Sequence, residues 1–181
     1  MANINWDNLE EQMGSKYKSF AEEGKHTVKC VDVEIKTTST GSVVEKFIFA
    51  EGEDCQYPTA DHWISKKNDN FRAYHQKNLL VALGASEANA RLAVEKAESK
   101  DDFDYAVKAY ETAFKSLLKK EPLVEIEVYT ARANNGKEYA RAEFTNKSVA
   151  MPHDNASSNN SNSAASVIDG GEEIDLSEIP F

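Results

Sequence analysis

Residues 123–144 read LVEIEVYTARANNGKEYARAEF, and two patterns in this segment predict a β-hairpin. Val124, Ile126 and Val128 alternate with polar or larger aromatic residues, which is typical of a strand with one buried face. Asn134-Asn135-Gly136 then predicts a tight turn, because Asn and Gly tolerate positive φ angles. The chain therefore returns along 137–144 as a second strand.

The returning strand carries residues that suit a nucleic acid. Alternation places Ala140, Ala142 and Phe144 inward and leaves the remaining side chains on the outer face. On that face, or beside the turn, an aromatic ring lies among cations: Arg132, Lys137, Tyr139 and Arg141. Bases stack on such a ring while cations contact phosphates, so this pattern favours a single-stranded nucleic acid as ligand.

Strands are also predicted in the first third of the chain. The segment 27–37 places Val31, Val33 and Ile35 on one face of a strand. After a turn at 39–42, the segment 43–50 forms the returning strand, with four residues on one side: Val43, Glu45, Phe47 and Phe49. A third strand is expected to pass through 56–57 and 62–64.

Residues 68–120 change to a helical period and predict helices over 71–83, 88–98 and 102–120. The last helix has apolar side chains at helical spacing, namely Phe103, Ala106, Val107, Tyr110, Phe114, Leu117 and Leu118. Asp101 or Asp102 is expected to cap its start, and Pro122 ends it. A further short helix is predicted near 6–18.

This order of elements predicts a mainly β fold with a helical insertion. The specific expectation is a five-stranded OB-fold (oligonucleotide-binding) barrel with helices between strands 3 and 4. A generic α+β domain is the alternative that the pattern leaves open. The barrel domain is expected over 1–150 and a flexible linker over 151–171, since 155–166 lacks any large apolar side chain. Residues 172–181 are expected to form a separate, disordered acidic tail.

The distribution of charge matters more than its sum. The formal net charge is −10. Six acidic residues and no Lys or Arg fall in 151–181, so the remainder holds 25 acidic and 21 basic residues. A nearly balanced domain permits a local basic face despite the low overall charge.

Further candidates for contact with DNA lie before and within the helical block. Trp63 and Phe47 supply rings, and the cations near them in sequence are Lys46, Lys66, Lys67 and Arg72. The alternative for Phe47 and Trp63 is that both rings belong to the hydrophobic core.

The end of the sequence resembles the tails of bacterial and phage single-stranded DNA-binding proteins. Those tails are acidic and disordered, and they end in an apolar tip such as Ile-Pro-Phe. The matching residues here are Glu172, Glu173, Asp175, Glu178, Ile179, Pro180 and Phe181. The resemblance implies that Phe181 fills an apolar pocket on a partner while the acids steer the tail toward basic surfaces. Leu176 and Ser177 interrupt the acidic run and depart from the family pattern.

A second resemblance covers residues 24–41. Gly24, the strand after it and the turn Ser39-Thr40-Gly41 look like the opening of small phage-encoded OB-type DNA-binding proteins. The two resemblances imply sequence-tolerant binding and protection of single-stranded DNA in phage replication, recombination and repair, in the cytoplasm of a bacterial host. The tail would recruit replication, recombination or repair proteins. Assembly into a homo-oligomer is a further expectation.

The sequence leaves two other functions open. One is a strand-annealing or recombination mediator protein, which also binds DNA. The other is an acidic interaction module or DNA mimic that binds no DNA.

An enzyme is not expected. The sequence has no phosphate-binding Gly-x-x-x-x-Gly-Lys loop, no Gly-x-Ser-x-Gly elbow and no His-Glu-x-x-His motif. Cys30, Cys55, His62 and His75 lack the paired spacing of a zinc site, so no metal or cofactor is expected. No apolar run approaches the roughly 18 residues of a membrane span.

Overall fold

The computed structural model describes residues 18–67 and 69–145. Its strands are β1 (Ser19–Phe20), β2 (Gly24–Thr37), β3 (Val43–Phe49), β4 (Cys55–Gln56), β5 (Ala60–Ile64), β6 (Leu123–Arg132) and β7 (Glu138–Phe144). Between β5 and β6 come the helices α2 (Asp69–Ala82), α3 (Glu87–Glu98) and α4 (Phe103–Leu118). The predicted helix near 6–18, the linker 151–171 and the tail 172–181 fall outside the described residues, apart from Lys18.

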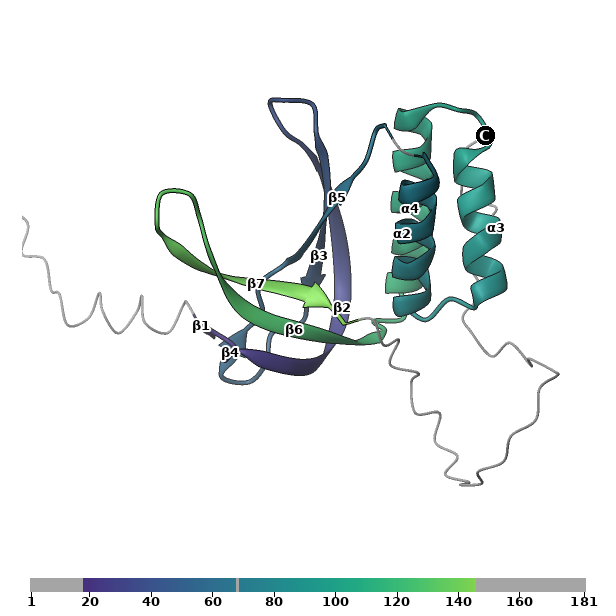
Figure 1. Ribbon diagram of the computed structural model, residues 1–181. Helices are drawn as coiled ribbons and strands as arrows, with labels where there is room; N and C mark the ends of the chain where they lie inside the picture. Colours follow the sequence, from purple (N-terminus) through teal and green to yellow (C-terminus); the bar gives the residue numbers. More distant parts are fainter. Residues whose placement is uncertain (1–17, 68, 146–181) are drawn as a thin grey trace, which may run out of the picture.

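Five strands close into a barrel in the order β2-β3-β5-β7-β6, with β6 pairing back onto β2. The barrel is mixed, because β5 and β7 run parallel while its other neighbours are antiparallel. The three helices stand together at one side of the barrel (Figure 1). The predicted mainly β fold with a five-stranded barrel is thus confirmed.

Two details of the strands differ from the sequence prediction. The register of β2 against β3 shifts between Cys30 and Asp32, so Cys30 and Val33 are buried while Val31 is only half-buried. An extra residue in one strand of a pair changes which side chains face inward. The predicted third strand also divides, because Pro58 separates β4 from β5 and cannot donate a ladder hydrogen bond. Of these two pieces, β4 pairs with β1 in a separate two-stranded sheet, and only β5 joins the barrel.

The two hairpin turns form where the sequence predicts them. Gly41 adopts φ +77° between β2 and β3, and Gly136 adopts φ +80° between β6 and β7. Both values lie in the left-handed region that favours glycine. Each turn extends the hairpin past the barrel (Figure 1).

The helices and the barrel share one hydrophobic core. Phe47 of β3 meets Phe114 of α4 and Phe144 of β7, in each case with ring centres 5.1 Å apart. Asp102 caps α4 by accepting a hydrogen bond from the amide of Tyr105, as the sequence predicts. The helical block is therefore packed onto the barrel. In the described part of the chain, no helix has the length and apolar character needed to cross a membrane.

Candidate nucleic-acid interface

Four predicted contact residues lie together on the β6–β7 hairpin (Figure 1). Arg132 ends β6, Lys137 lies in the turn, and Tyr139 and Arg141 lie on β7. Tyr139 is 46% exposed, and Arg141 lies directly opposite Tyr129 across the hairpin. The structure therefore presents the ring and the cations on one hairpin, as the alternation predicts.

The second group lies on the outer face of β3 and β5. Trp63 is 53% exposed, and in the register it lies opposite Val44. One step along the same face, Lys46 lies opposite Asp61, and its ammonium is 2.7 Å from the Asp61 carboxylate. Trp63 is thus a surface ring with a paired cation close by.

The two groups share the outer surface but do not form one cluster. Ala60 of β5 lies opposite Ala142 of β7, and these two strands run parallel. Trp63 follows Ala60, whereas Tyr139 precedes Ala142. At about 3.3 Å per residue the two rings lie roughly 20 Å apart along the strands. A single strand would have to cross β5 and β7 to meet both.

Two predicted contact residues are buried, so the prediction that they bind DNA is wrong. Phe47 is 0% exposed and packs between the Phe114 and Phe144 rings, so no base can stack on it. Arg72 is 5% exposed, and its guanidinium donates to the Glu98 carboxylate and to the Ser65 carbonyl. Arg72 holds α2 against the end of α3 and the segment after β5.

The remaining two cations lie between β5 and α2. Lys66 is exposed, and its ammonium lies 5.0 Å from the centre of the Phe103 ring. Lys67 is exposed as well. Both are accessible to solvent, which a phosphate contact requires.

Acidic side chains are interspersed with the cations of this surface. Arg132 pairs with Glu138 at 2.7 Å, and the Tyr129 hydroxyl donates to Glu143 at 2.5 Å. Burial, followed by this hydrogen bond to Glu143, raises the pKa of Tyr129. The surface is therefore a mosaic of both signs, on which ring stacking counts for more than net charge.

A buried polar network joins the barrel to the helices beneath this surface. Glu45 of β3 is 0% exposed, and it accepts hydrogen bonds from His62 of β5 and Gln76 of α2, both at 3.0 Å. Burial raises the pKa of Glu45, and the hydrogen bonds from His62 and Gln76 oppose that rise. Next to it, Tyr110 of α4 donates to Glu98 at 2.5 Å. Each charge in this junction has a specific partner, as buried charges require.

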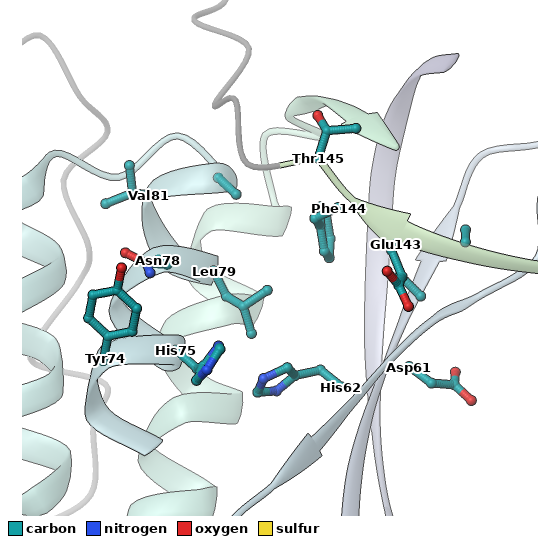
Figure 2. A pocket seen from close by; sticks show the side chains of 13 residues that line it. Asp61, His62, Tyr74, His75, Asn78, Leu79, Val81, Glu143, Phe144 and Thr145 are labelled. Atoms are coloured by element: carbon teal, nitrogen blue, oxygen red, sulfur yellow. The ribbon is translucent and has the colours of Figure 1, made fainter. Parts of the chain in front are cut away.

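A groove opens where β5 and β7 diverge beside α2. It has a volume of about 800 Å³ and is lined by Ala60, Asp61, His62, Tyr74, His75, Asn78, Leu79, Val81, Ala82, Ala142, Glu143, Phe144 and Thr145. Figure 2 shows His62 and His75 pointing toward one another from β5 and α2, with Glu143 on the barrel side. Their ring centres are 5.7 Å apart. Burial, and then the charge of His62, lowers the pKa of His75.

Neither this groove nor the exposed rings of α2 are predicted from the sequence. Phe71 and Tyr74 are both exposed, at 52% and 62%. With His75 and Asn78 they recur at helical spacing along α2, and that stripe was the available signal. A stripe of aromatic residues usually indicates a buried face, so the pattern favoured the core over a surface.

No model of a protein family matches the chain, and no curated protein matches it significantly. Among the described residues, no group of three or more His, Cys, Asp or Glu side chains is placed to hold a metal ion. The class that the structure defines is a closed five-stranded mixed barrel with a helical insertion and exposed aromatic residues.

Proposed function

We propose that the barrel is an OB-fold and that the protein binds single-stranded DNA without strong sequence preference. The observation that carries this proposal is the strand order. When the five barrel strands are numbered in chain order, they lie around the barrel in the order 1-2-3-5-4 and close back onto the first, with strands 3 and 5 parallel. The helices come between strands 3 and 4. OB-folds bind oligonucleotides on the face of strands 2 and 3. The loop between strands 1 and 2 and the loop between strands 4 and 5 contribute to the same site.

In this barrel that face carries the exposed Trp63 ring, and the exposed Tyr139 ring follows the second of those loops. Strands 2 and 3 are β3 and β5, which carry Lys46 and Trp63, and the second hairpin loop carries Lys137 next to Tyr139. Each base–aromatic stack contributes about 1–3 kcal/mol and tolerates any base. Two exposed rings on one surface therefore support binding that depends little on sequence.

The biological context of the proposal comes from the sequence resemblance alone. We propose protection of single-stranded DNA during phage replication, recombination or repair. In this proposal the acidic segment 172–181 recruits partner enzymes. Binding alone accounts for this role, with no covalent chemistry.

A binding titration tests the proposal. We would measure the fluorescence anisotropy of labelled oligo-dT with the full chain and with residues 1–150, across a series of salt concentrations. We expect binding by the full chain and by residues 1–150, weakened by salt because phosphate contacts release counterions. Arg132→Ala should weaken binding and reduce the salt dependence, because it removes one phosphate contact. Glu95→Ala, at an exposed carboxylate of α3, is the control.

The alternatives predict different results. An annealing or mediator protein would bind oligo-dT and also accelerate pairing of complementary strands. An acidic interaction module would bind no oligonucleotide, even at low salt. If neither the full chain nor residues 1–150 bind oligo-dT, the proposal is overturned.

A further inference from the structure

We propose that the groove between α2 and the β5–β7 seam, which we name the base groove, accepts one base of the bound strand. In this inference the groove favours bases with an exocyclic amino group over thymine. It rests on the proposed function and extends the DNA-binding surface from the barrel onto the helical insertion. The juxtaposition that carries it is the Tyr74 and His75 rings of α2 on one side of the groove and Glu143 of β7 on the barrel side.

The groove has the size and position that a base requires. Its volume of about 800 Å³ lies within the range of small-molecule sites. The groove opens at the seam between β5 and β7. In the described residues these two strands pair at one position, Ala60 opposite Ala142. Asp61, which lines the groove, lies on the same outer face of β5 as Trp63, about 7 Å away along the strand. A strand stacked on Trp63 therefore reaches the groove with a neighbouring nucleotide.

The helix side of the groove supplies rings for stacking. Tyr74 lines the groove, and its ring centre lies 5.7 Å from that of His75. His75 in turn contacts Phe71 at 4.1 Å and faces His62 at 5.7 Å. Rings from two elements thus form a continuous aromatic wall. Such walls hold unstacked bases, because every base has a π face.

The charges of the groove select a base over a phosphate. Asp61 and Glu143 line it, and among its described lining residues none is Lys or Arg. A phosphate would meet carboxylates, whereas an amino group on cytosine, adenine or guanine can donate to them. Both oxygens of Asp61 already accept hydrogen bonds, from Lys46 and Thr59. Glu143 accepts from Tyr129 through its Oε1, so its Oε2 is the acceptor assigned to the base, and thymine offers it no exocyclic donor.

The histidines support the same selection. The low pKa of His75 keeps its ring neutral near neutral pH, so it adds no attraction for phosphate. His62 is held in place by the buried Glu45 carboxylate, 3.0 Å from its Nδ1. Gln76 fixes that carboxylate in turn, from the inner side of α2. A groove wall fixed in this way can position a flat ligand.

The test compares oligo-dC with oligo-dT of equal length on the full-length protein, by anisotropy at neutral pH. We expect oligo-dC to bind several-fold more tightly. Glu143→Gln should bring the ratio of the two affinities close to one, because the amide offers thymine a donor and loses the carboxylate charge. Tyr74→Ala should weaken binding of oligo-dC by about 10-fold, the loss of one stack, and binding of oligo-dT by less.

Two controls separate the groove from general effects. Glu95→Gln removes one exposed carboxylate from α3 and should leave the ratio unchanged. Tyr129→Phe removes the hydrogen bond to Glu143 and keeps the carboxylate, so the preference for oligo-dC should persist. As a direct measurement, deoxycytidine monophosphate should shift the NMR signals of the His62 and His75 rings more than thymidine monophosphate does.

The outcomes distinguish this inference from the proposed function. Equal binding of the two oligonucleotides, unchanged by Tyr74→Ala and without histidine shifts, would overturn the base groove. It would leave single-stranded DNA binding by the barrel standing. Failure of both oligonucleotides to bind would overturn the proposed function and the base groove together.

Discussion

Helices α2 and α4 lie in the same insertion, yet they distribute polar and apolar residues in opposite ways. On α4 the buried side chains are apolar or aromatic, among them Tyr110 and Phe114. On α2 the buried face includes Arg72 and Gln76, while Phe71 and Tyr74 are exposed. Apolar burial is the main favourable term in folding, so the helix that departs from it needs a separate explanation.

The difference shows that the two helices contribute in different ways. In α4 the hydrophobic face packs against the barrel through Phe114 and Phe47. In α2 the buried polar groups contact specific partners, because Arg72 pairs with Glu98 and Gln76 with Glu45. The rings that α2 does not bury line or flank the base groove. Buried polar residues therefore fix the position of α2, and its exposed rings are available to a ligand.

The largest expected effect is on α4. Phe114→Ala should lower the free energy of unfolding by about 3–5 kcal/mol, because it leaves a cavity against Phe47 and the barrel. Urea denaturation followed by circular dichroism measures this loss. The matched control is Leu92→Ala on α3, whose side chain is half exposed and should cost far less. Similar losses for both variants would mean that α4 does not pack on the barrel as described.

The next effect concerns the polar partner of α2. Glu98→Ala removes the carboxylate that Arg72 and Tyr110 share and leaves the guanidinium buried without its counter-ion. We expect a loss of about 3 kcal/mol in the free energy of unfolding, within the range for broken buried ion pairs. Glu95→Ala on the same helix is exposed and should change stability little. If Glu98→Ala and Glu95→Ala lower the free energy of unfolding by similar small amounts in the urea assay, the Arg72–Glu98 pair does not anchor α2.

Trp63 is an exposed ring of the barrel, and its removal should affect binding more than folding. Trp63→Ala should weaken binding of oligo-dT by about 1–3 kcal/mol, the contribution of one base stack. Its free energy of unfolding should fall by less than about 1 kcal/mol, because the side chain is 53% exposed. Anisotropy and urea denaturation measure the two quantities. The reverse result, with stability lost and binding intact, would assign Trp63 to the core.

The barrel could be predicted from the sequence because alternation determines which face of a strand is buried. Val124, Ile126 and Val128 are buried as their spacing predicts, and the turns at Gly41 and Gly136 lie where glycine is needed. The shift at Cys30 could not be predicted, because a bulge depends on how two strands meet and leaves no pattern in either one. Alternation within each strand does not determine the order of the strands around the barrel.

The candidate site could be predicted only in part. Tyr139 and Trp63 are exposed as expected. The sequence predicts a DNA contact at Arg72, because nothing near it in sequence indicates burial. Its partner Glu98 is distant in sequence and approaches only when α2 and α3 pack together. The base groove could not be predicted, because His62, His75 and Glu143 come from three elements whose contact depends on the complete fold.

The smallest expected effect completes the comparison of the two helices, with the same substitution made in each. Tyr74→Ala on α2 should change the free energy of unfolding by no more than about 0.5 kcal/mol, since the ring is exposed and alanine favours the helix. Tyr110→Ala on α4 removes a fully buried ring and its hydrogen bond to Glu98, so it should cost several kcal/mol. Urea denaturation of both variants measures the contrast. A loss above about 2 kcal/mol for Tyr74→Ala would place that ring in the stabilising packing of α2, and its exposure would then need no ligand to explain it.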